Sequence, residues 1–150
     1  MHSPRIDDAG PLVSQTRPVL LLCAIYDGLL DLAFLFFAEP IFRVLGIEST
    51  ADPIYVQLAA GLIAIMGLGF FLAWRDPLRN RDLVLLGAVF KAFYILLAAY
   101  ALVRGEVPHP VFLVFAAIDI LFLIVFVRFL RDSTAVQAAG AASIVGERGP

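Results

Sequence analysis

The chain has 150 residues, of which 61% are hydrophobic and only 16% are charged, and its formal net charge is −2. Soluble domains carry roughly 25% charged residues, so the composition excludes an ordinary soluble domain and indicates an integral membrane protein. The basic residues are dispersed and form no basic cluster that would indicate nucleic-acid binding. The single cysteine, Cys23, cannot form an intrachain disulfide, and no Cys/His cluster has metal-ligand spacing. We therefore expect no metal and no other cofactor.

The first third of the chain combines a polar segment, one apolar run and a short amphipathic stretch. Residues 1–16 offer too little apolar surface to fold alone, and we expect a flexible tail. Residues 17–38 form the first predicted span, in which Pro18 is tolerated because the first helical turn needs no amide partner. Segment 40–47 is too short to cross a bilayer and predicts an interfacial helix that ends at Gly46.

Three further apolar runs complete the predicted membrane domain. Each is about 20 residues long, enough for ~30 Å of hydrocarbon. These spans are 54–74, 82–103 and 110–130. The short charged linker 75–82 predicts an antiparallel hairpin, and residues 132–150 lack a sustained apolar face and predict a second flexible tail. The expected fold is an all-α polytopic membrane protein, an antiparallel up-down four-helix bundle over residues 17–131.

The arginines are distributed unequally between the two predicted membrane faces. Eight lie on the side of the termini and two lie opposite. The first set is Arg5, Arg17, Arg75, Arg79, Arg81, Arg128, Arg131 and Arg148, and the second is Arg43 and Arg104. Because positive charge is retained in the cytoplasm, we expect both termini to be cytoplasmic in a bacterial inner membrane.

Four ionisable residues lie inside the predicted spans. Asp27, Lys91 and Asp119 fall within about two residues of the middle of their spans, and Asp31 lies one helical turn beyond Asp27. A charge at the bilayer centre costs about 2.5–3.5 kcal/mol, so these residues should face inward and meet. One lysine cannot neutralise three acids, and we expect Asp27 and Asp31 to share a proton.

The expected site is therefore a midplane cluster that binds a ligand or a proton. Its members are Asp27, Asp31, Lys91, Asp119 and Tyr94. Glu39, at the end of the first span, is a candidate for the mouth of a cavity. No nucleophile–base pairing is present, so we assign no catalytic residue. Two interpretations stay open, because buried ion pairs also lock helices together without any chemistry.

Several local motifs resemble the small four-span bacterial membrane proteins called DoxX-like. They are the acid in the first span, Pro40 and Leu45-Gly46 after it, Ala59-Ala60-Gly61, the hairpin Arg75–Asn80, the pair Gly87 and Lys91, and Asp119. The resemblance covers residues 17–131. It implies a bacterial membrane protein of a family in which some members are subunits associated with quinone-linked oxidoreductases. A more distant similarity is to four-helix sterol-isomerase-like proteins, whose ligand cavity is lined by acids.

These observations favour a non-catalytic protein in the lipid bilayer. We expect either an accessory subunit of a larger membrane complex or a binder of a small hydrophobic, quinone- or sterol-like ligand. One alternative is a proton-coupled transporter that works as a homodimer, since four spans rarely enclose a pathway. Another is a lipid or sterol isomerase with Asp27 or Asp119 as the proton donor.

Overall fold

A computed structural model describes residues 10–48, 52–107 and 109–146. These residues form four helices: α1 (Gly10–Leu45), α2 (Pro53–Arg75), α3 (Arg81–Arg104) and α4 (Val111–Gly146). All four are long and apolar enough to cross a membrane. The predicted all-α class and the four-helix bundle are confirmed, and the chain is a multi-pass membrane protein.

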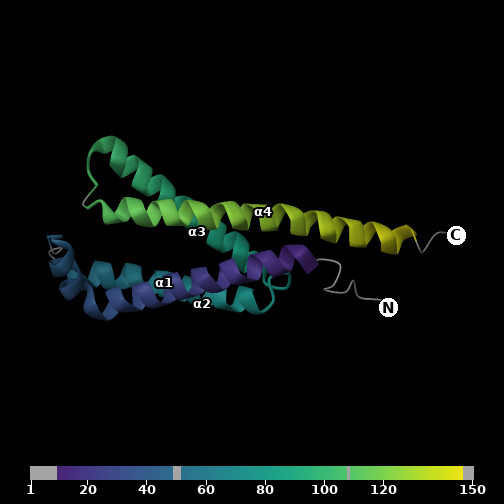
Figure 1. Cartoon of the computed structure of the whole chain (residues 1–150), viewed down its shortest axis with the longest axis horizontal. Helices are drawn as coiled ribbons and strands as arrows, with labels where there is room; N and C mark the ends of the chain where they lie inside the picture. Colours follow the sequence, from purple (N-terminus) through teal and green to yellow (C-terminus); the bar gives the residue numbers. More distant parts are fainter. Residues whose placement is uncertain (1–9, 49–51, 108, 147–150) are drawn as a thin grey trace.

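The bundle consists of two hairpins laid against each other (Figure 1). Successive helices alternate in direction, so α1 begins and α4 ends at the same end of the bundle. Packing is most extensive within the hairpins α1–α2 and α3–α4, and the contacts between the hairpins are fewer. We call the end where α1 begins the arginine-rich end and the opposite end, where α1 and α3 finish, the open end.

Helix α1 is longer than predicted and is kinked. It begins at Gly10, inside the segment predicted as a tail, and continues past Pro40. The backbone leaves helical geometry at Phe37, with φ −130° and ψ 28°, because a proline in a helix removes one amide hydrogen bond and crowds the carbonyl four residues earlier. The predicted interfacial helix is therefore the last part of α1, and it ends as expected at Gly46, whose φ is +68°.

The kink folds the end of α1 back over the open end of the bundle. The rings of Phe34 and Phe42 lie 5.9 Å apart between centroids, although residues eight apart in a straight helix are separated by about 12 Å along the axis. The amide of Ile47 then donates to the carbonyl of Phe42 at 2.9 Å and closes the helix end.

Helix α4 also exceeds its predicted span. It has 36 residues and so a length of about 54 Å, and it continues to Gly146. Residues 132–146, which were predicted to belong to a flexible tail, are therefore helical. That segment is rich in alanine, the strongest helix former, and it can extend an existing helix without an apolar face.

The half of the bundle near the arginine-rich end is tightly packed, and we call it the closed half. Its core contains fully buried side chains from every helix: Leu20, Phe70, Ala73, Val84, Phe126 and Phe129. Arg17 donates to the carbonyls of Trp74 and Arg75 at 3.1 and 2.6 Å. Arg81 donates to α4, at the Leu130 carbonyl and the hydroxyls of Ser133 and Thr134. One arginine thus ties together each hairpin.

Candidate functional site

Lys91 lies at the centre of the buried charge cluster. Its Nζ donates a hydrogen bond to Asp27 Oδ1 at 2.7 Å and lies 2.8 Å from Asp119 Oδ1. The second contact is an ion pair without hydrogen-bond geometry. Lys91 and Asp27 are each 1% exposed, and Asp119 is 5% exposed. Residues from α1, α3 and α4 thus meet, as predicted from their similar positions near the middle of their spans.

Glycines allow the helices to approach closely around this cluster. A Cβ on Gly67 of α2 would lie 2.7 Å from the backbone nitrogen of Gly28 in α1, the residue after Asp27. A Cβ on Gly87 of α3 would collide with the ring of Phe70. Gly67 thus lets the backbones of α1 and α2 approach closely, and Gly87 leaves room on α3 for the ring of Phe70.

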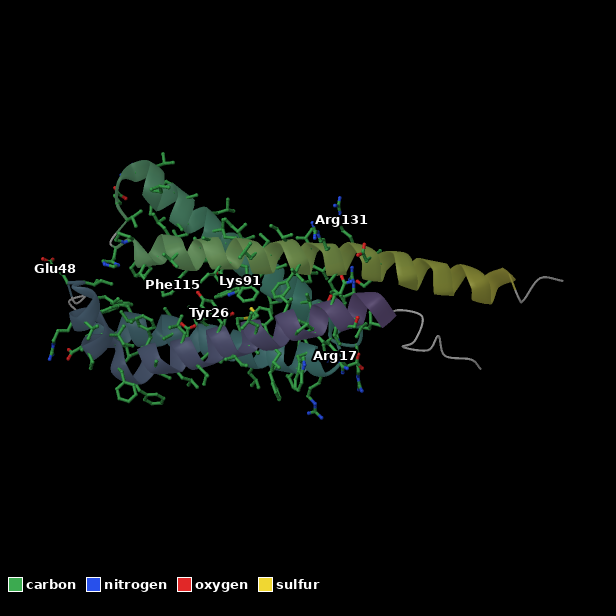
Figure 2. All side chains as sticks on the ribbon, in the orientation of Figure 1. Arg17, Tyr26, Glu48, Lys91, Phe115 and Arg131 are labelled. Carbon is green, nitrogen blue, oxygen red and sulfur yellow. The ribbon has the colours of Figure 1, made fainter. Side chains whose placement is uncertain are left out.

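Aromatic rings surround the lysine ammonium. The ring centroids of Tyr26, Phe70 and Phe122 lie 5.4, 5.9 and 5.5 Å from Lys91 Nζ. Such rings attract a cation through their negatively charged faces. Figure 2 shows Tyr26, Lys91 and Phe115 pointing into the space between α1 and α4. The thiol of Cys23, which no sequence motif marks as part of the site, contacts Asp27 Oδ2 at 3.7 Å as a weak donor.

A cavity of about 440 Å³ begins at the cluster and extends toward the open end. All four helices line it, mainly with aliphatic and aromatic side chains. Its charged lining residues are Asp27, Asp31, Lys91, Asp119 and Glu48. Glu48 lies at the open end of the bundle (Figure 2). The cluster therefore lies at the boundary between the closed half and a hollow half.

Asp31 is the acid of the cluster that Lys91 does not hold. It is 8% exposed and lines the cavity. Within residues 10–48, 52–107 and 109–146, no hydrogen bond or ion pair involves its carboxylate. The predicted sharing of a proton with Asp27 stays a prediction, since no direct hydrogen bond joins the two side chains in that part of the chain.

Two further predicted residues have different outcomes. Tyr94 lines the cavity, but its hydroxyl donates to the backbone carbonyl of Phe112 at 3.2 Å and links α3 to α4. Glu39 is exposed and does not line the cavity. The acid at the mouth is Glu48, because the helix after the kink carries the chain across the open end before residue 48. Pro40 could have indicated this change of direction, because a proline within a helix commonly causes a kink.

The remaining chemistry of the site is limited. Among the residues that the structure describes, no group of three His, Cys, Asp or Glu side chains could hold a metal ion. Comparisons with known proteins return no matching family model, no matching curated protein and no matching solved structure. The geometry of the cavity and of its charged inner end is therefore the basis for a functional proposal.

Proposed function

We propose that this membrane protein binds a small hydrophobic molecule that carries one polar group. The apolar part occupies the cavity, and the polar group lies against the charged inner end. The observation that carries this proposal is the 440 Å³ cavity with apolar walls and buried acids at one end. Ligand sites in proteins commonly have about 300–1,000 Å³ and a few well-placed polar groups within an apolar lining.

A purely structural role for the charge cluster accounts for less of what is observed. An ion pair that only locks helices needs no cavity beside it, and the closed half is densely packed. On the other side of the same ion pair the bundle is hollow. An unfilled apolar cavity destabilises a protein, because its walls lose contacts that packing would provide. A ligand that fills the space removes that cost.

The membrane orientation predicted from the arginines indicates the side of the membrane toward which the cavity opens. With the arginine-rich end in the cytoplasm, the open end and Glu48 face the opposite side of a bacterial inner membrane. The resemblance to DoxX-like proteins suggests that the chain is an accessory subunit and that the bound molecule is used by a larger membrane complex. The ligand-binding part of the proposal depends on neither expectation.

The packing of the closed half disfavours the transporter alternative. Fully buried Phe70, Phe126 and Phe129 occupy the space between the cluster and the arginine-rich end. A transport path through one copy would need this packing to open. The isomerase alternative requires an acid directed at the substrate, whereas both predicted donors, Asp27 and Asp119, are engaged by Lys91. Binding without turnover fits the geometry better.

Native mass spectrometry of protein gently extracted from its own membranes tests the proposal. We expect a retained lipid-like molecule with the unmodified chain. Ile63 lines the cavity, whereas Ile65 on the same helix is 65% exposed. Ile63→Phe should therefore reduce the retained ligand several-fold, and Ile65→Phe should leave it unchanged. Equal occupancy in both variants, or no retained molecule in any of them, would contradict a role for the cavity in binding.

A further inference from the structure

We propose that the polar group of the ligand is a cation, a protonated amine, and that Asp31 is the carboxylate that receives it. This inference rests on the proposed function and specifies its ligand class.

The cavity is lined by acids in excess of bases. Among the described residues its lining holds four acids, Asp27, Asp31, Glu48 and Asp119, and one base, Lys91. The ammonium of Lys91 contacts two of these acids. No second cationic side chain of that part of the chain lines the cavity. The site therefore supplies acceptors and negative charge beyond what the protein itself can match.

Asp31 is the acid whose surroundings call for an external partner. It is 8% exposed, lines the cavity and has no hydrogen bond or ion pair within the described residues. Buried polar groups in proteins are nearly always satisfied, and an unpaired buried carboxylate is costly. A ligand ammonium supplies both the charge and the hydrogen-bond donors that this carboxylate lacks.

The position of Asp31 also lets a ligand cation avoid Lys91. Asp31 lies one helical turn from Asp27, about 6 Å along the axis toward the open end. Asp27 and Asp119 both contact Lys91 Nζ, and their two carboxylates offset its charge. The rings of Phe34 and Phe115 line the same cavity, and the faces of aromatic rings attract a cation. The ammonium therefore has its own subsite between the cluster and the mouth.

A pair of probes of equal shape tests this assignment. The protein is placed in nanodiscs of zwitterionic lipid, and binding of 4-phenylbutylamine and 4-phenylbutanol is measured by equilibrium dialysis against empty nanodiscs. We expect the amine to bind about tenfold more tightly, as a charge-assisted hydrogen bond requires. Asp31→Asn should bring the two affinities within about twofold of each other. The exposed acid Asp82 lies at the arginine-rich end, and Asp82→Asn should keep the preference for the amine.

The outcomes separate this inference from the proposed function. Equal binding of amine and alcohol to the unmodified protein overturns the inference and leaves the proposed function standing. An amine preference that survives Asp31→Asn overturns the assignment to Asp31. Loss of both probes in Asp31→Asn also overturns it, since removal of one charge should spare the alcohol. The proposed function itself fails if Ile63→Phe and Ile65→Phe retain equal amounts of native ligand, or if no molecule is retained by the unmodified chain and the variants.

Discussion

The replacement Lys91→Met provides the strongest test of the charge cluster. It removes the hydrogen bond to Asp27 at 2.7 Å and the ion pair to Asp119 at 2.8 Å, and methionine keeps most of the side-chain volume. Two carboxylates that are 1% and 5% exposed then lose their cation. Breaking a buried ion pair costs about 3–5 kcal/mol, and the loss of both contacts places the expected destabilisation at the upper end.

Reversible unfolding with sodium dodecyl sulfate in mixed micelles, followed by far-ultraviolet circular dichroism, measures this loss. The control is Phe93→Met on the same helix, where the side chain is 65% exposed and faces the membrane. We expect that control to change the free energy of unfolding by no more than about 0.5 kcal/mol.

Removal of the acids then tests the origin of the loss. The triple variant Lys91→Met, Asp27→Leu, Asp119→Leu should recover more than half of it, because apolar replacement of a whole buried ion pair is often neutral or favourable. The double variant Lys91→Met, Asp119→Leu should recover less of the lost stability. It keeps Asp27, the acid that accepts the hydrogen bond from Lys91 in the unmodified protein. A loss below about 1 kcal/mol for Lys91→Met, or a triple variant no more stable than the single one, would refute this account of the cluster.

Two other predictions concern the packing of the closed half and access to the hollow half. Gly67→Ala should destabilise the bundle by about 1–3 kcal/mol, since its Cβ would lie 2.7 Å from the Gly28 nitrogen, whereas Gly69→Ala meets nothing within 4 Å and should be neutral or slightly stabilising. Equal effects in a thermal-unfolding assay would show that the helix approach is not tight there. The chain has one cysteine, so the variant Cys23→Ala contains no thiol. A new cysteine at Ala59, in the cavity lining, is then introduced into this variant. A membrane-impermeant thiol reagent should label Ala59→Cys from the open end only. Ala73→Cys, at a fully buried position, should resist it, and equally fast labelling of both would contradict the closed half.

The spans and the charge cluster could be predicted because the bilayer imposes strong constraints. A span needs about 20 apolar residues, and a charge within it must find a partner. Asp27, Lys91 and Asp119 share a depth on different helices, so inward-facing spans bring them together. These two rules do not depend on side-chain packing, and they led to the correct fold class and to the ion pairs.

The shape of the cavity and the position of its mouth could not be predicted from the same rules. They depend on the direction of α1 after Phe37 and on the angle between the two hairpins, both of which arise from local packing. The sequence therefore suggested Glu39, at the end of the first apolar run, as the mouth, although the chain crosses the open end and places Glu48 there. The limits of α1 and α4 were missed for another reason, since helices can extend beyond the hydrocarbon where nothing in the sequence stops them.

The two halves of the bundle differ in how firmly they are held, and this difference decides where a ligand can alter the structure. Five hydrogen bonds from Arg17 and Arg81 fix the arginine-rich end, and the aromatic core behind them is fully buried. Helix α3 crosses α4 obliquely and diverges from it toward the open end (Figure 1), where the hydroxyl of Tyr94 provides a hydrogen bond between the two helices. Under the proposed binding function, adjustment to a ligand therefore requires the smallest loss of contacts at the open end, and the Lys91 cluster forms the fixed inner end of the site.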